Sequence, residues 1–267
     1  MTQVTGRRRW WIVLLGVLIA YLLLAYVLLP ALWSHHEHEP GLASPPMVTR
    51  TADGVPGDAL NVGLVRAGTM SSAPCTLPAG IPQILSRCAR VLRSSAAWRL
   101  TGHTMMRRSV PLYHQGKKEQ LAFEKPDGKS ADRRHHVRFW QVLDKGTDGR
   151  PVWLGSVTFD RGVGLSHDTG QVTHPIAPDI DAERDGLMRD LREAGMVQNF
   201  FQISGVGPTL FGRNGEGDSY YTDGEVHIAT LVVDGVRSAE QPVSIAPPPR
   251  IALKDQVWHG IASTVAE

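Results

Sequence analysis

The longest run of hydrophobic positions in the chain lies near its start. From Trp10 to Trp33 there is no charged side chain, and a helix of this length is sufficient to cross the ~30 Å hydrocarbon core of a bilayer. Trp10, Trp11 and Trp33 stand at the two ends of the run, where amphipathic indole rings prefer the headgroup region. The pattern therefore predicts a transmembrane helix over residues 10–33.

The charges on either side of this run are distributed unequally. Arg7, Arg8 and Arg9 precede it, whereas no Lys or Arg follows it before Arg50. Positively charged flanks stay on the cytoplasmic side of a membrane. The sequence therefore predicts that residues 1–9 are cytoplasmic and that the bulk of the chain lies outside.

A cleavable signal peptide is the alternative interpretation of the same run. Its hydrophobic region would cover about 7–15 residues, and a small-residue cleavage site would follow it. The run here is longer, and PALWSHH contains no convincing site of this kind. The adjacent arginines match a twin-arginine export signal only loosely. We therefore expect a signal anchor that is retained.

Beyond residue 57, strand patterns alternate irregularly with two helical patterns. A helix is expected over 79–97, and a second at DAERDGLMRDLREAG, where Leu187 and Leu191 are four positions apart and Gly195 is a natural stop. The Asp223-Gly224 pair between strand-like residues indicates a two-residue hairpin. Strands are expected at ALNVGLV, LAFEK, HVRFWQVL, PVWLGSVTFD, MVQNFFQIS and EVHIATLVV.

Because strands and helices do not alternate regularly, the pattern predicts an α+β fold. It would contain an antiparallel or mixed sheet and two main helices, behind one N-terminal transmembrane helix. The predicted organisation is a basic cytoplasmic N-terminus (1–9), a transmembrane signal anchor (10–33), a linker (34–57), a globular domain (58–246) and a C-terminal tail (247–267).

Composition and charge narrow the class of protein. Apolar residues make up 42% of the chain and charged residues 20%, which is typical of a domain with a packed core. Beyond Arg9 the chain holds 25 basic and 26 acidic residues. A body so close to neutral has no electrostatic footprint for nucleic acid, and we expect no such partner.

A histidine-rich tract follows the hydrophobic run directly. His35, His36 and His38 alternate with Glu37 and Glu39. Such tracts can bind metal, but without a fixed scaffold they bind weakly and unselectively. Beside a membrane and before a segment with Pro and Gly, a hydrated tether at headgroup level is the favoured interpretation.

Two cysteines, Cys75 and Cys88, are present in the whole chain. An even pair outside the cytoplasm indicates a disulfide that closes a short loop. Cys88 also falls on the apolar stripe of the helix expected over 79–97, so a buried thiol is the alternative. Because one sulfur would lie on the helix and the other on the loop before it, both interpretations are compatible, and we favour the disulfide.

The segment HPIAPDIDAERD, residues 174–185, gathers polar residues at a predicted helix start. Asp181 is a natural N-cap for a helix that begins at Ala182, and Glu183 and Asp185 would favour the positive end of the helix dipole. Helix capping therefore explains about half of this segment.

The remaining polar residues are candidates for chemistry. His136 and His174 could act as acid/base groups or ligands, and Asp179 as a ligand. Arg138, on the same strand face as His136, and Arg184 could hold an oxyanion. No spacing here matches a zinc-binding pattern, so the sequence leaves metal and cofactor open, and a purely structural ion-pair network is the alternative.

The glycine-rich segment FGRNGEGDSYYTDGE is a second candidate. Its backbone could approach a ligand closely, and it would present Arg213, Asp218 and Tyr220, or these side chains would pin the loop itself. No Gly-Lys-Ser/Thr follows, which excludes a Walker-type phosphate loop.

Five segments together resemble the LssY C-terminal domain family. From about residue 58 to about residue 235 they occur in the family's order: LNVGLV, RRHHVRFW, VWLGSVTFD, THPIAPDIDAERDGL and FGRNGEGDSYYTDGE. The resemblance implies a bacterial, envelope-associated domain and no particular activity. Two departures stand out, because His174 precedes Pro175 where a doubled histidine is expected, and QGKKEQLAFE has Lys117 and Gln120 in place of a glycine–arginine–aspartate pattern.

These observations predict a single-pass protein of the inner (cytoplasmic) membrane, with its body in the periplasm or outside. Its bilayer contact would be residues 10–33, and an envelope lipid or a membrane protein would be its partner. The favoured function is a binding or accessory module in lipid metabolism or secretion. The alternatives are a metal- or His/Asp-dependent hydrolase of phosphorylated envelope lipid or glycan, and a structural module of a secretion or lipid-trafficking assembly.

Overall fold

The computed structural model describes residues 3–35, 39–65, 99–100, 111–128, 132–166, 170, 172–232 and 238–265. His36 and His38, the helix expected over 79–97, and the cysteines Cys75 and Cys88 lie outside the described residues. The disulfide therefore stays a prediction.

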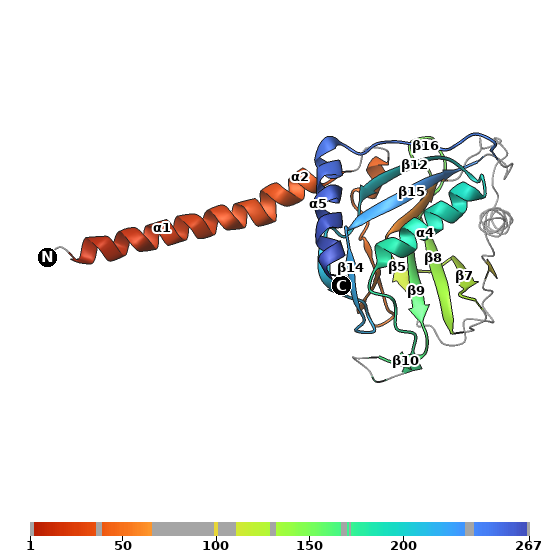
Figure 1. The fold of residues 1–267 in the computed structure, drawn as a ribbon, viewed down its shortest axis with the longest axis horizontal. Coiled ribbons are helices and arrows are strands. Elements are labelled where there is room, and N and C mark those ends of the chain that lie inside the picture. Colours follow the sequence, from red (N-terminus) through yellow and green to blue (C-terminus); the bar gives the residue numbers. More distant parts are fainter. Residues whose placement is uncertain are drawn as a thin grey trace.

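An apolar helix projects from the body, as the sequence predicts (Figure 1). It consists of α1 (Gln3–Leu23), the π-helical turn η1 (Leu24–Leu28) and α2 (Leu29–Trp33). Within the 25 residues Arg9–Trp33, the most apolar 18-residue window has a mean hydropathy of 2.9, and none of that window is buried against the body. Length and apolarity suit this helix to crossing a membrane.

The body is built on one eight-stranded mixed sheet. The pairs β12–β16 and β15–β3 are parallel and all the others are antiparallel, which confirms the predicted α+β class. Its strands, in spatial order, are β16 (Val243–Ser244), β12 (Val197–Ser204), β15 (Glu225–Leu231), β3 (Val62–Val65), β9 (Val152–Arg161), β8 (Arg133–Leu143), β7 (Leu121–Pro126) and β4 (Arg99–Leu100).

Helix α4 (Ile180–Glu193) covers one face of this sheet (Figure 1). Leu187 and Leu191 of the helix and Val137 and Phe139 of β8 belong to one buried cluster, because side chains four apart share a helix face and alternate residues share a strand face. The helix ends before Gly195, whose φ of +65° lies in the left-handed region, so the predicted stop is confirmed.

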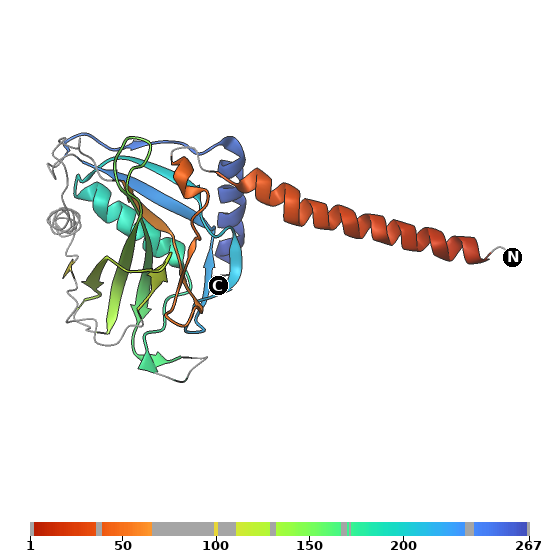
Figure 2. The ribbon, with the colours of Figure 1, turned by 180° about the vertical axis from the view of Figure 1, so that it is seen from behind.

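The N-terminal part of the body covers the opposite face of the sheet (Figure 2). Leu42, Leu60, Trp140 and Leu154 belong to the buried cluster on this side. The covering elements are η2 (Pro40–Leu42) and a small sheet in the order β2 (Pro56–Ala59), β1 (Val48–Arg50), β5 (Tyr113–His114) and β6 (Lys117–Lys118).

The predicted linker over 34–57 therefore differs from the structure, in which most of it forms part of the body. Leu42 is fully buried, and the Glu39 carboxylate accepts a hydrogen bond from the Thr147 backbone N–H at 3.0 Å. The elements η2 and β1 have three residues each. They are therefore too short to give a periodic pattern in the sequence.

The apolar helix, which fits a membrane anchor, is fixed to the body without a free tether. His35 is buried, and its backbone N–H donates to Oγ of Ser204 at 2.6 Å, while the Ser204 N–H donates to the His35 carbonyl at 2.8 Å. The Ser204 hydroxyl also donates to the Trp33 carbonyl at 3.3 Å. The hydrated tether expected at His35 is therefore not what the structure contains.

The chain ends in a helix that packs on the body and beside the anchor. In α5 (Pro249–Val265), Ile251 and Trp258 are buried, and Lys254 forms an ion pair with Glu225 of β15. Arg250 donates from Nη2 to the Ser34 carbonyl at 3.2 Å. The part of the predicted tail that the structure describes, up to residue 265, thus belongs to the folded body.

Two short ribbons complete the fold: β10 (Gly164–Leu165) with β11 (Val172–Thr173), and β13 (Thr209–Arg213) with β14 (Ser219–Thr222). The predicted Asp223-Gly224 hairpin is wrong, because β14 pairs with β13 whereas β15 pairs in the main sheet. These two residues carry the chain from one sheet to the other. Gly224 has a φ of +80°, and a Cβ there would lie 2.0 Å from the Gly207 carbonyl carbon.

Candidate functional site: a polar pocket on the main sheet

The pocket floor comes from alternate residues on two paired strands. His136 and Arg138 of β8 share a face, and their partners across the pair with β9 are Thr158 and Ser156. Asp160 follows two positions after Thr158 and lies on the same face. The polar end of this face is thus built from residues that the antiparallel register places side by side.

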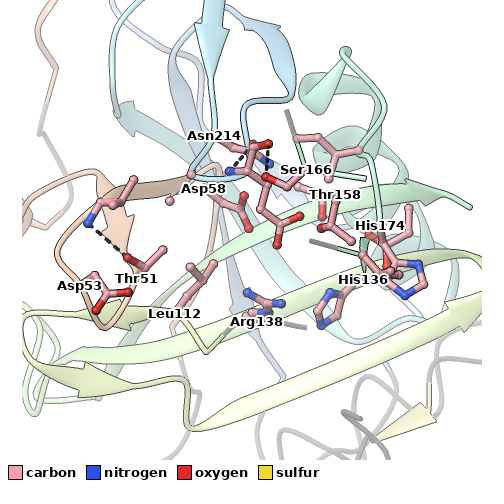
Figure 3. Close-up of a pocket in the computed structure, with 18 residues that line it drawn as sticks. Thr51, Asp53, Asp58, Leu112, His136, Arg138, Thr158, Ser166, His174 and Asn214 are labelled. Atoms are coloured by element: carbon pink, nitrogen blue, oxygen red, sulfur yellow. Dashed lines mark hydrogen bonds between the residues drawn. The ribbon is translucent and has the colours of Figure 1, made fainter. Parts of the chain in front are cut away.

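A cavity of about 230 Å³ lies over this floor. Thr51 and Asp58 line it from the N-terminal cover, His174 lines it from the chain after β11, and Asn214 and Glu216 line it from the loop between β13 and β14. In Figure 3 the side chains of His136, Arg138, Asp58 and His174 face one common space. The pocket therefore unites at least five segments of the chain, namely β8, β9 and the three that form these walls.

Two of these walls are held by hydrogen bonds to the backbone. Oδ1 of Asn214 accepts from the N–H groups of Glu216 at 3.0 Å and Asp218 at 2.9 Å, which shapes the loop. Nδ1 of His174 donates to the Gly162 carbonyl at 2.9 Å. This bond holds the His174 ring in place at the edge of the pocket.

Arg138 is the buried cation of the pocket. Its side chain lies inside the protein, with the residue only 7% exposed. Among the described residues its Nε has no hydrogen-bond partner, and the guanidinium has no carboxylate oxygen within 4.0 Å. A buried guanidinium is normally paired, so this arrangement has unused capacity for an anion.

His136 lies beside Arg138 and is 5% exposed. Burial lowers the pKa of its imidazole well below the usual value, and the positive charges of Arg138 and Arg134 lower it further. Its Nε2 has no hydrogen-bond partner among the residues that the structure describes. At neutral pH the ring is therefore uncharged, and it can accept or donate one proton.

The carboxyl groups of the pocket shift in the opposite direction. Burial raises the pKa of Asp160 to about 6, although Arg134 donates to its carboxylate at 3.0 Å and opposes the shift. Burial, with the nearby carboxylates of Asp58 and Asp218, raises the pKa of Glu216 to about 7. Burial likewise raises the pKa of Asp58. Near neutral pH Glu216 can therefore carry a proton and donate a hydrogen bond, and Asp160 can do so in slightly more acidic solution.

Of the residues singled out in the sequence, His136, Arg138 and His174 come together in this pocket. Asp179 does not line it. Asp179 is the N-cap of α4, and its Oδ1 accepts from the Ala182 N–H at 3.0 Å. The capping role predicted for Asp181 is therefore wrong, because the helix begins two residues earlier than expected, at Ile180.

Arg184 also lies away from the pocket. It is 2% exposed, and its Nη1 and Nη2 donate to the two carboxylate oxygens of Asp223 at 2.7 and 3.0 Å. Nη1 also reaches Asp181 at 3.3 Å, and Nε donates to Asp185 at 2.9 Å. Carboxylates already surround this guanidinium, so it is not available to hold an oxyanion. Because Asp223 lies in the turn before β15, Arg184 fastens α4 to that turn.

The three residues named in the glycine-rich segment hold that segment together. Arg213 donates to the Gly217 carbonyl at 3.1 Å, and the Asp218 carboxylate accepts from the Ile176 N–H at 3.2 Å. Tyr220 belongs to a small apolar cluster with Ile176. None of the three side chains lines the pocket, although Asp218 raises the pKa of Glu216.

Sequence reasoning missed the four polar residues Asp58, Asp160, Asn214 and Glu216. Asp160 could have been predicted from the sequence, because it ends a predicted strand and shares a face with Thr158. The others come from segments that only the tertiary fold brings together. Among the described residues, no group of three or more His, Cys, Asp and Glu side chains is arranged to hold a metal ion.

Comparison with known proteins gives a family match over part of the chain. Residues 97–226 match the model of the LssY C-terminus family, which confirms the resemblance that the sequence carries. The match includes every pocket residue from His136 to Glu216, whereas Thr51 and Asp58 precede it. No curated protein and no solved structure matches the chain.

Proposed function

Because residues 97–226 match the LssY C-terminus family and lie behind an apolar helix, we propose a membrane-anchored binding module. Its pocket takes a small ligand that carries an anionic group, a phosphate or a carboxylate. The protein is a single-pass component of the inner membrane of a bacterial envelope, with its N-terminus in the cytoplasm and its body in the periplasm. An envelope lipid headgroup is a ligand of the required chemistry.

The single observation that carries this proposal is the buried guanidinium of Arg138, which forms no ion pair with any of the described residues and whose Nε has no hydrogen-bond partner among them. Removing a charge from water without a partner is costly, and an anion in the pocket would offset that cost. A guanidinium offers a planar set of donors that matches phosphate or carboxylate oxygens. Protonated Asp160 and Glu216 would add donors of their own.

The dimensions of the pocket limit the ligand. Its volume of about 230 Å³ lies below the ~300–1,000 Å³ usual for pockets that hold drug-sized molecules. A headgroup, rather than a whole lipid, fits a space of this size. Thr51 and Thr158 supply hydroxyl groups to the lining, as a polar headgroup requires.

Binding of inorganic phosphate to the full chain in detergent micelles, measured by isothermal titration calorimetry, tests the proposal. We expect the Arg138→Gln variant to bind about tenfold more weakly or worse, because a hydrogen bond to a charged group contributes about 1.5–3 kcal/mol. Arg161→Gln is the matched control. Arg161 is exposed on the neighbouring strand β9 and does not line the pocket.

Two results would contradict the proposal. One is native protein that binds neither phosphate nor acetate, and the other is equal binding by Arg138→Gln and native protein. A thermal melt of each variant separates loss of the site from loss of the fold.

A hydrolase is the second candidate, and the opposed pKa shifts of His136 and Glu216 favour it. Neutral His136 could take a proton from an attacking water, while protonated Glu216 gives one to the departing oxygen of a phosphoester.

In the same preparations, turnover of p-nitrophenyl phosphate would be lost in both His136→Gln and Glu216→Gln. His135→Gln is the control, since His135 points to the other face and pairs with Glu183 at 2.6 Å. Turnover that survives both pocket substitutions would remove this candidate.

A further inference from the structure

Helix α5 has two apolar sides. Ile251, Lys254 and Trp258 face the body and are buried. Leu253, Val257 and Ile261 are 55%, 55% and 40% exposed. Because they are spaced four residues apart, these three form one stripe along the helix. We call Leu253, Val257 and Ile261 the outer stripe.

The helix lies where the anchor joins the body. Residues of α2 contact α5, and Arg250 in the first turn of α5 donates to the Ser34 carbonyl at 3.2 Å. Figures 1 and 2 both show α5 lying across the end of the anchor, between the anchor and the sheet. The side of α5 that faces away from the sheet is therefore the side of the anchor.

The end of the anchor marks the level of the membrane surface. Trp33 is the last residue of the apolar helix, and tryptophan prefers the headgroup region. Ser34 follows directly and touches α5. A helix held across the anchor at this level lies along the bilayer surface rather than through it.

We propose that α5 is an interfacial helix whose outer stripe enters the boundary between headgroups and acyl chains of the leaflet that the anchor leaves. Three large aliphatic side chains on one stripe are unfavourable in water and favourable at that boundary. The charges agree with this position. Arg250 is exposed, no exposed residue of α5 over 249–264 is acidic, and Asp255 is held at the body by Gln202 at 3.0 Å.

The inference extends the proposed function and does not depend on what fills the pocket. A span alone leaves the body free to rotate about the anchor axis. A second contact, along α5, would prevent that rotation and fix which side of the body faces the membrane.

Depth measurement by electron paramagnetic resonance tests this contact in the full chain. The protein, with Cys75→Ser and Cys88→Ser, is reconstituted into vesicles of phosphatidylethanolamine and phosphatidylglycerol. A nitroxide is placed on Val257→Cys or, as the matched control, on Gln256→Cys, which is exposed beside the outer stripe. We expect the ratio of collisions with oxygen to collisions with a water-soluble nickel chelate to be several-fold higher at 257 than at 256.

Equal ratios at the two positions would overturn the proposal, because the outer stripe would then lie in water. A label at 257 that meets neither reagent would also overturn it, since a protein partner or a second copy would then cover the outer stripe. The pair Ile261→Cys and Ser263→Cys repeats the comparison one turn later, in case a label at 257 disturbs the fold.

Discussion

Arg138 shares its pocket with carboxyl groups that change their charge near neutral pH. When Asp160 and Glu216 carry protons, they do not repel an anion, and their O–H groups can donate to it. When they lose those protons, two negative charges oppose the attraction of one guanidinium. We therefore expect the proton balance of these side chains to control anion binding in the pocket.

This balance predicts a pH dependence of anion binding. The folded pKa values of Asp160 and Glu216 are raised to about 6 and about 7, and a bound anion would raise them further, so binding takes up protons. Affinity is then fully present at low pH and is lost as the pH rises through these values, by roughly tenfold per unit for each proton taken up. The test is a calorimetric titration with sulfate from pH 5 to pH 8. Sulfate stays a dianion over this whole range, so its own charge does not change.

In Glu216→Gln the slope of this dependence should decrease by about one proton at its upper end, around pH 7. An affinity for sulfate that does not change with pH in the native protein would contradict the argument.

A site residue could be predicted where a local pattern in the sequence places it, and not where only tertiary contacts bring it to the pocket. His136 and Arg138 could be assigned to one face from the strand period alone. His174 could be grouped with them only by its chemistry. Asp58 and Glu216 reach the pocket through tertiary contacts, and no local pattern marks them. Asp179 was misassigned because two aspartates, two residues apart, are both suitable N-caps.

At the scale of elements, the attachment of α4 to the turn before β15 depends on one side chain. Arg184 holds Asp223 with two hydrogen bonds, and Asp223 is itself buried. We expect Arg184→Ala to lower the free energy of unfolding by about 3–5 kcal/mol, because the substitution leaves a buried carboxylate without its cation. Denaturant unfolding of the full chain in detergent, followed by tryptophan fluorescence, measures the loss.

Arg189→Ala is the comparison on the same helix. Arg189 is exposed, so its removal should change the stability by less than about 0.5 kcal/mol. Similar losses in the two variants would mean that the buried ion pair contributes nothing beyond an ordinary surface charge.

Elements with a long apolar period were predictable, and elements defined by their partners were not. The strands β8, β9, β12 and β15 and the helix α4 follow from alternation or four-residue spacing. The Asp223-Gly224 pair has the local signature of a hairpin, but Arg184 and Asp181 bind this turn and hold it where two sheets meet. Tertiary contacts here override turn preference.

At the scale of the whole molecule, the arginine cluster predicts the orientation in the membrane. We expect alkaline phosphatase fused after Glu267 to be active in a bacterial host, and a green fluorescent protein fused at the same place to stay dark, because the flank with Arg7, Arg8 and Arg9 remains in the cytoplasm. Inactive phosphatase together with bright fluorescence would place the body in the cytoplasm and reverse the assignment.

The division of the molecule was only partly predictable. The apolar span and the α+β body follow from hydropathy and strand pattern. The junction does not, because Ser204 lies far along the chain from the anchor that it holds. Short elements such as η2 and β1 have a sequence that resembles a linker. In the structure, however, Leu42 is buried in the cluster on the sheet.

The fixed junction has a mechanical consequence. The 25-residue apolar span is about 37 Å long as a helix, whereas the hydrocarbon core is ~30 Å thick. A span longer than the core relieves the mismatch by tilting. Since Ser204 and Arg250 bind the last turn of the span and the residues after it, the body would lean with it. With this helix in a bilayer, the membrane thickness would set the inclination of the pocket, and a thicker membrane would hold the whole domain more upright.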